Sequence, residues 1–353
     1  MKAGIVGLPN VGKSTLFNCL SNAKAQSANF PFCTIEPNIG IINVPDQRLE
    51  KLEKLVNPEK VIPATVEIVD IAGLVKGASK GEGLGNQFLA NIRETDAILH
   101  VLRCFDDDNI VHVEGSVDPA RDKEIIDLEL QLKDLETLEK RLEKINRLVK
   151  TGNKDAIKES NILKKIINHL QSFNPVRSLN FSRDDKEFVD SIQLITSKPV
   201  LYVCNVDESA AIKGNNHVEN LKNSLNDENA EIMILAIGTE ADINELDSYE
   251  DRQSFLLDIG LSEPGSVKLI KNAYDLLNLQ TYFTAGLKEV RAWTISKGMN
   301  APKAAGVIHT DFEKGFIRAE VISYENYIKY GSESKAREAG KLNIEGKDYV
   351  LND

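Results

Sequence analysis

Short runs of aliphatic and β-branched residues alternate with helical patterns in the first third of the chain. The runs lie at Ala3 to Val6, Ile39 to Val44, Thr65 to Val69 and Ala97 to Arg103. Such alternation is typical of an α/β sheet with crossover helices. Two further runs, Lys198 to Cys204 and Glu231 to Ala236, resume the pattern after a long gap. We therefore predict one α/β sheet that is interrupted by an insertion.

The gap itself has a helical pattern. Residues 121 to 150 place aliphatic side chains at three- and four-residue spacing among many Glu and Lys, and they are Ile125, Leu128, Leu132, Leu135, Leu138, Leu142, Ile145 and Val149. This spacing predicts an amphipathic helix of coiled-coil character. A turn signal at residues 151 to 154 and a second apolar stripe up to Leu170 predict a returning helix. The resulting hairpin either packs only on itself and the core or serves as a partner-binding arm.

Beyond about Leu279 the composition shifts to aromatic and β-branched segments separated by glycine. Three of them are expected to be strands of a small module: Arg291 to Ile295, Gly306 to Ile308 and Phe316 to Ile322. The predicted domains are a discontinuous nucleotide domain at 1–120 and 196–278, a helical insertion at 121–195 and a C-terminal module at 279–353.

Charge and hydropathy limit the classes of partner. The formal net charge of −11 over 353 residues argues against a protein that coats nucleic acid, because phosphate binding needs clustered Lys and Arg, so no DNA partner is expected. No stretch approaches the roughly 20 apolar residues of a membrane helix. Four widely spaced cysteines without a CxxC pair favour buried, reduced thiols. A cytoplasmic protein without a membrane partner is expected.

The strongest motif follows the first predicted strand. Residues 7 to 14, Gly-Leu-Pro-Asn-Val-Gly-Lys-Ser, fit G-x-x-x-x-G-K-[ST] and precede a helical pattern, which is the context of a phosphate-binding P-loop. Backbone N–H groups of the loop and the helix N-terminus would hold the phosphates of a nucleoside triphosphate. Lys13 would reach the β- and γ-phosphates, and Ser14 would ligate Mg²⁺. The nucleotide-binding residues expected here are Asn10, Val11, Gly12, Lys13, Ser14 and Thr15.

Two later segments fit the switches of a hydrolysing P-loop protein. Asp70 ends a strand and begins Asp-Ile-Ala-Gly, which places a carboxylate near Mg²⁺ and the N–H of Gly73 near the γ-phosphate. Thr34 lies in the polar loop where a switch protein senses Mg²⁺ and γ-phosphate. A plain turn at Asp70 and a strand-entry role for Thr34 are the alternatives. The five glycines of residues 73 to 85 imply a mobile second switch.

The residue that should orient the attacking water is absent. Leu74 occupies the position where a Ras-like enzyme has glutamine, so hydrolysis must use another group, the backbone, a cation or a partner, and should be slow. His112 lies in a polar loop after the strand beside the P-loop strand and is the candidate for that role. A lone histidine is more often structural, and that alternative stays open.

The base-recognition motif also departs from the guanine-specific pattern. Residues 205 to 208 are Asn-Val-Asp-Glu where a guanine-specific protein has Asn-Lys-x-Asp, whose carboxylate accepts from two donors that adenine lacks. Glu208 is one methylene longer than Asp, and Val206 removes the lysine that flanks the base. Guanine specificity should therefore be weakened or inverted.

Taken together, these motifs and the glycine-rich segment through Asn86-Gln87-Phe88 closely resemble the YchF subfamily of the Obg family, the Obg-like ATPases. The resemblance runs from end to end and implies a Ras-like P-loop domain with an inserted coiled-coil hairpin and a C-terminal β-grasp-like TGS domain. It also implies ATP preferred over GTP, ribosome association, and base contacts by Asn205, Val206 and Glu208. Asn10 matches an asparagine that coordinates K⁺ in some related GTPases. Family members usually continue past residues 348–350 into an apolar strand, so the TGS sheet is expected to lack an edge strand.

Two other classes of protein compete with a hydrolysing switch. A P-loop kinase would need an acceptor pocket and an arginine-rich lid, and the sequence indicates neither. A binding protein that only senses nucleotide would tolerate Leu74 well. GTP as the physiological ligand is the second choice within the favoured class.

Overall fold

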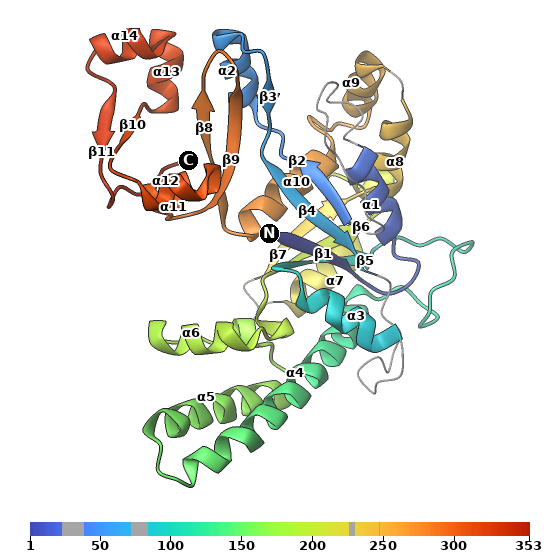
Figure 1. The fold of residues 1–353 in the computed structure, drawn as a ribbon. Coiled ribbons are helices and arrows are strands. Elements are labelled where there is room, and N and C mark those ends of the chain that lie inside the picture. Colours follow the sequence, from blue (N-terminus) through green and yellow to red (C-terminus); the bar gives the residue numbers. More distant parts are fainter. Residues whose placement is uncertain (23–38, 72–83, 226–229, 247) are drawn as a thin grey trace. The chain divides into compact units, whose positions relative to one another are not determined.

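The computed structural model describes residues 1–22, 39–71, 84–225, 230–246 and 248–353 (Figure 1). Its main sheet has six strands in the order β2-β4-β1-β5-β6-β7. They are β1 (Lys2–Val6), β2 (Ile39–Asn43), β4 (Thr65–Asp70), β5 (Ala97–Arg103), β6 (Val200–Asn205) and β7 (Glu231–Leu235). All six runs predicted as strands are confirmed.

The centre of this sheet is parallel. β1 pairs with β5, β5 with β6 and β6 with β7, with Leu99 opposite both Ile5 and Leu201. Every residue of β5 and β6 is buried, which explains why these strands read as continuous apolar runs. Because parallel strands end at one edge of a sheet, the loops that follow β1, β5 and β6 meet there.

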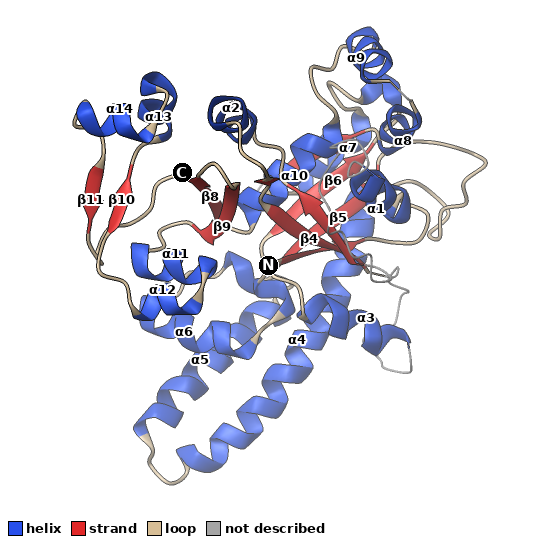
Figure 2. Cartoon of the chain, turned by 45° about the horizontal axis from the view of Figure 1, so that its top comes forward, coloured by secondary structure: helices blue, strands red, loops and turns tan. Residues whose placement is uncertain are grey.

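Along the chain, helices follow these strands in the order expected of an α/β fold (Figure 2). They are α1 (Lys13–Asn22), α2 (Gln47–Val56), α3 (Leu84–Arg93), α7 (Asn216–Ser224), α8 (Ile237–Glu245), α9 (Tyr249–Asp258) and α10 (Gly265–Leu276). None of the described helices has the length and apolar character that a bilayer-spanning segment needs. Cys19, Cys104 and Cys204 are free and buried, as predicted, whereas Cys33 lies outside the described residues.

The insertion contains the predicted helical hairpin, α4 (Pro119–Val149) and α5 (Lys154–Gln171), followed by α6 (Arg183–Ile192). Figure 1 shows α4 and α5 running antiparallel. Each begins at a side-chain cap: Asp118 accepts from the N–H of Arg121, and Asn153 from that of Ala156. An apolar cluster that includes Leu138 and Leu163, both fully buried, joins the two helices. Burying each such side chain contributes roughly 1.5–3 kcal/mol.

The apolar stripe of α4 is not continuous, contrary to the prediction. Leu128 and Leu132 remain 40% and 39% exposed, whereas Ile126 and Leu130 are buried. The N-terminal part of α4 packs on β5 and α7, and its C-terminal part packs on α5. The buried face of the helix therefore changes along its length. The buried carboxylate of Asp134 accepts from the N–H groups of Ile195 and Thr196 at 2.9 and 2.8 Å, which fixes α4 to the segment that leads into β6.

The described residues divide into two compact units, one drawn from 1–20, 39–40, 68–71, 84–225, 230–246 and 248–265 and the other from 21–22, 41–67 and 266–353. The second contains a sheet in the order β3-β9-β8, in which β8 is an edge strand. Its further elements are β3 (Val61–Ile62), β8 (Leu279–Ala285), β9 (Val290–Ser296), α11 (Ala301–Ile308), α12 (Thr310–Lys314), β10 (Ala319–Val321), α13 (Tyr324–Tyr330), α14 (Glu333–Glu338) and β11 (Asn343–Glu345).

Two strand predictions for this unit need correction. Residues 306–308 end helix α11 instead of forming a strand, because Asn300 and Pro302 start a helix that runs through three alanines. The strand expected at 316–322 is reduced to β10, which pairs with β11. The strand expected at 291–295 is confirmed as β9.

Candidate functional site

The loop between β1 and α1 depends on two glycines. A Cβ atom on Gly7 would lie 2.5 Å from the carbonyl oxygen of Val101, so only glycine lets β1 end this close to β5. Gly12 has φ +100°, and a Cβ there would lie 2.7 Å from Nδ2 of Asn205. The loop is therefore compact, and it leads directly into the first turn of α1, where unpaired N–H groups favour anions.

Lys13 is the cation at the centre of this loop. Its side chain is only 7% exposed, and Nζ donates to the carbonyl oxygen of Leu8 at 2.6 Å. Burial lowers the pKa of Lys13 to about 8, although the charge of Asp70 acts in the opposite direction. A buried ammonium with a lowered pKa gains most from an added anion, so the loop is suited to phosphate.

Two of the three predicted Mg²⁺ ligands, Ser14 and Asp70, lie together. Ser14 donates from Oγ to Oδ2 of Asp70 at 3.2 Å, which joins the start of α1 to the end of β4. Hydroxyl and carboxylate oxygens are the donors that Mg²⁺ prefers, and one carboxylate is a usual number where phosphates supply the rest. Thr34, Gly73 and Leu74 lie outside the described residues.

The loop after β6 is held to the P-loop by Asn205. This side chain is 5% exposed, and its Nδ2 donates to the carbonyl oxygen of Val11 while its Oδ1 accepts from the N–H of Ile237, both at 3.0 Å. Both amide atoms are thus used by backbone, which favours a positioning role over direct contact with a base. Val206 is buried. Glu208 is exposed at the start of a 3-10 turn, Glu208–Ala210.

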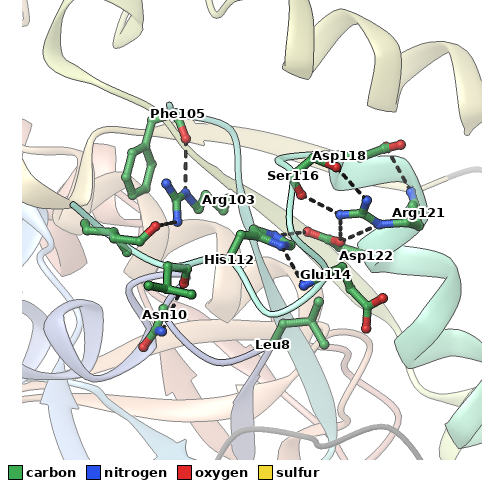
Figure 3. Close-up of polar contacts among 12 residues, drawn as sticks. Leu8, Asn10, Arg103, Phe105, His112, Glu114, Ser116, Asp118, Arg121 and Asp122 are labelled. Atoms are coloured by element: carbon green, nitrogen blue, oxygen red, sulfur yellow. Dashed lines mark hydrogen bonds and ion pairs between the residues drawn. The ribbon is translucent and has the colours of Figure 1, made fainter. Parts of the chain in front are cut away.

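The loop after β5 is organised by Arg103, a residue that the sequence analysis did not single out. Its side chain is among the largest that are fully buried. Its guanidinium donates to the carbonyl oxygen of Phe105 (Figure 3) and also to those of Asp107 and Ile110, all at 2.8–3.1 Å. The guanidinium also lies over the ring of Phe105. An arginine at the end of a buried strand that is apolar apart from His100 was the available signal, because arginine is rarely buried without partners.

His112 lies further along this loop and points to the root of the insertion (Figure 3). Its Nε2 is 2.9 Å from Oδ2 of Asp122, which is fully buried in the first turn of α4, and its Nδ1 accepts from the N–H of Glu114. Oδ1 of Asp122 accepts from Nε and Nη2 of Arg121. Both nitrogens of His112 are therefore engaged within the protein.

Asn10 connects this loop to the P-loop. It has φ 62°, a left-handed conformation that asparagine tolerates, and Nδ2 donates to the carbonyl oxygen of Val111 at 3.1 Å. The structure thus brings Asn10, Lys13, Ser14, Asp70, Asn205 and His112 into one connected set of loops, at the edge where the parallel strands end.

Comparisons with known proteins find similar proteins over the whole length of this chain. A family model described as "50S ribosome-binding GTPase" matches residues 2–154, and one named YchF-GTPase_C and described as "Protein of unknown function (DUF933)" matches residues 279–353. A Bacillus subtilis (strain 168) protein named "Ribosome-binding ATPase YchF" is 54% identical and covers 100% of this chain and 97% of its own length. The protein of that name from Escherichia coli O157:H7 is 53% identical, with coverage of 100% and 96%. The solved structure of the Schizosaccharomyces pombe YchF GTPase matches with a TM-score of 0.91 at 38% identity, over 100% of this chain and 96% of that one.

Proposed function

Because the chain belongs to the YchF family, as the resemblance indicated, we propose that it binds ATP with Mg²⁺ at the P-loop and hydrolyses the bond between the β- and γ-phosphates slowly. The observation that carries this proposal is the meeting of Ser14 and Asp70 beside the buried Lys13. Lys13 would neutralise the β- and γ-phosphates, and Mg²⁺ would offset the charge that develops on their oxygens. Thr34 and Gly73 would complete the site by sensing the γ-phosphate.

ATP is the preferred nucleotide in this proposal, and GTP is the second choice. The exposed Glu208 would face the base, while the buried Asn205 would hold the loop that carries it. Glu208 does not reproduce the aspartate that pairs with guanine, and Val206 contributes only its backbone. The names of the bacterial relatives, which call them ATPases, agree with this choice.

His112 is proposed to assist hydrolysis in place of the missing glutamine. The ring would have to exchange its bond to Asp122 for one to the attacking water or the γ-phosphate, because both of its nitrogens are engaged within the protein. A K⁺ ion beside the amide oxygen of Asn10 would be a second source of positive charge. Slow turnover follows if this rearrangement precedes each chemical step.

Association with the ribosome is the proposed role of the switch. The bacterial relatives carry ribosome binding in their names, and the family model that matches residues 2–154 does so too. Ordering of Thr34 and Gly73 by ATP and their release on hydrolysis would alter how the rest of the chain meets this partner. A cytoplasmic location follows from that partner.

The first test is the pair of affinities for ATP and GTP, measured by calorimetry with Mg²⁺ and K⁺ present. ATP should bind at least about tenfold more tightly, which corresponds to about 1.4 kcal/mol. Tighter GTP binding would instead make the protein a GTPase with an unusual base loop. A nucleotide-sensing protein without useful turnover is tested by His112→Ala: normal function in cells, despite lost hydrolysis, would favour that alternative.

A further inference from the structure

A basic groove lies where the end of α3 meets the middle of α4, away from the nucleotide loops. It has a volume of about 590 Å³ and is lined by the cations Arg93, Lys133, Lys140, Arg141 and Lys144. Its acidic lining residues are Glu136 and Glu159. Figures 1 and 2 both place α3 beside α4. In a chain with net charge −11, this local excess of positive charge is a departure from the rest of the molecule.

The carboxylate of Glu136 already lies between two of these cations. Lys133 and Lys140 donate to its two oxygens at 2.8 and 2.5 Å. These two hydrogen bonds lower the pKa of Glu136 to about 2. An anion is thus well accommodated at this point of the groove.

The other three cations have no acidic partner within hydrogen-bonding distance among the described residues. Arg93 donates from Nη2 to the hydroxyl of Thr137, and its Nε is buried without a partner in the described part of the chain. Arg141 lies over the ring of Phe188, 5.0 Å from its centroid. Lys144 is exposed. Glu136 therefore leaves most of the positive charge of the groove uncompensated.

The cations of α4 form a stripe instead of converging on one point. Lys133, Lys140, Arg141 and Lys144, with the uncharged Thr137 between the first two, recur at spacings of three, four and seven residues and so share one face of the helix. At 1.5 Å per residue, Lys133 and Lys144 are about 16 Å apart along the axis. A row of this length matches several successive charges of a polyanion better than a single phosphate ion.

We propose that the groove between α3 and α4 binds the phosphate backbone of RNA, through Arg93, Lys140, Arg141 and Lys144. This inference rests on the proposed association with the ribosome and names RNA as the class of molecule that this face contacts. The contacts are to phosphate and not to bases, so binding is independent of sequence and strongly dependent on salt.

The test compares two double variants of the full-length protein. Arg141→Gln/Lys144→Gln removes two charges from the groove. Lys164→Gln/Lys165→Gln is the matched control, because it removes two charges from α5, one of them stacked on Phe181 as Arg141 is on Phe188. Binding to purified ribosomes and to ribosomal RNA freed of protein is measured over a range of KCl concentrations. ATP hydrolysis without ribosomes monitors folding.

The groove variant should bind both probes more weakly, and the slope of log affinity against log salt should fall by about one for each lost phosphate contact. The control should behave as the parent protein does. The proposal is overturned if both variants lose affinity equally, or if only ribosome binding depends on the groove, which would indicate a ribosomal protein as occupant. If the parent protein does not bind ribosomes, the proposed function fails, and groove-dependent binding to free RNA still decides this inference.

Discussion

His112 donates from Nε2 to the buried carboxylate of Asp122, because its other nitrogen, Nδ1, faces the N–H of Glu114 and must be the acceptor. The imidazole is thereby held in one tautomer, by a residue of the first turn of α4. His112, which is proposed to act on the nucleotide, is thus hydrogen-bonded to the first turn of the helical insertion. Anything that moves this turn of α4 changes the availability of the ring.

Replacing Asp122 with asparagine should therefore speed ATP hydrolysis. The introduced amide would have one oxygen for two donors, His112 and Arg121, so one of the two bonds is lost while the side-chain volume is kept. A hydrogen bond to a charged group contributes about 1.5–3 kcal/mol. If His112 no longer has to break its bond to a charged Asp122, the barrier falls by part of this free energy and kcat should rise by about tenfold. Single-turnover hydrolysis at saturating ATP is the measurement.

Two further variants make that result interpretable. Asp127→Asn makes the same change on the same helix, at a residue bonded to Lys123 instead of His112, and should leave the rate unchanged. Asp122→Asn should have no effect in a His112→Ala background. A slower Asp122→Asn enzyme with intact ATP affinity would mean that Asp122 supports His112 instead of withholding it.

Lys13 should make nucleotide binding dependent on pH in the alkaline range. Burial lowers the pKa of Lys13 to about 8, and bound phosphates would raise it again, so binding above pH 8 must take up a proton. The affinity for ATP should fall by up to about tenfold per pH unit above 8. Calorimetry at pH 9 in two buffers of different ionisation enthalpy should detect this uptake, and its absence would show that Lys13 is already charged in the free protein.

Asn205 should affect both nucleotides equally. Asn205→Ala removes two buried hydrogen bonds, to Val11 and Ile237, each contributing about 1 kcal/mol. Affinities for ATP and GTP should therefore fall together by about 10- to 30-fold. A selective loss of one nucleotide would instead indicate that Asn205 contacts the base.

Glu208 should affect the choice between the nucleotides. Glu208→Asp restores the length of a guanine-binding carboxylate on a loop that Asn205 still holds. The ratio of ATP to GTP affinity should shift toward GTP by about tenfold, or 1.4 kcal/mol. Glu208→Gln is the companion variant, since it keeps the length and removes the charge; a ratio that neither change alters would place the base elsewhere.

His100 should make the fold sensitive to acid. This residue of β5 is buried, its Nε2 has no partner among the described residues, and burial lowers its pKa to about 4 from 6.5. Between about pH 6.5 and 4, His100 is therefore protonated in the unfolded chain but neutral in the folded protein. Stability from this group is complete above about pH 6.5 and is lost as the pH falls toward 4, by about 1.4 kcal/mol per unit.

His100→Phe tests this directly. Phenylalanine keeps a ring beside Tyr202, whose centroid is 5.4 Å from that of His100, but it cannot take up a proton. Urea unfolding between pH 6.5 and 4 should show a shallower pH dependence in the variant, by about one proton. Equal slopes in the two proteins would show that His100 does not titrate in this range.

The sequence predicted the sheet and hairpin well because their signals are local. Mostly apolar runs mark β5 and β6, and aliphatic residues at three- and four-residue spacing from Ile125 to Val149 mark α4. The failed prediction at residues 306–308 has a local cause too: an apolar triplet has no period of its own, and the helix start at Asn300 decides its conformation. Short apolar segments need the context of their caps.

Long-range contacts were beyond the sequence. The P-loop motif predicted Lys13 and Ser14, but no spacing rule indicates that Asn205 would join Val11 to Ile237, or that Asp122 would bind His112. Such bonds depend on which loops the sheet brings to one edge. Arg121 and Asp122 lie in the first turn of α4. An acidic residue is favourable at that position in any helix, so Asp122 gave no sign of a contact with His112.

The long excursion between β5 and β6 has a consequence for how the chain folds. These neighbouring strands pair in parallel although one ends at Arg103 and the other begins at Val200. Contacts between α4 and α5 are local and form early, whereas pairing of distant strands is slow. In the folded state the N–H of Thr196 donates to Asp134, so a hairpin that formed first would hold the segment before β6 close to β5. The insertion thus shortens the effective loop that must close, and weakening it should slow folding more than it hastens unfolding.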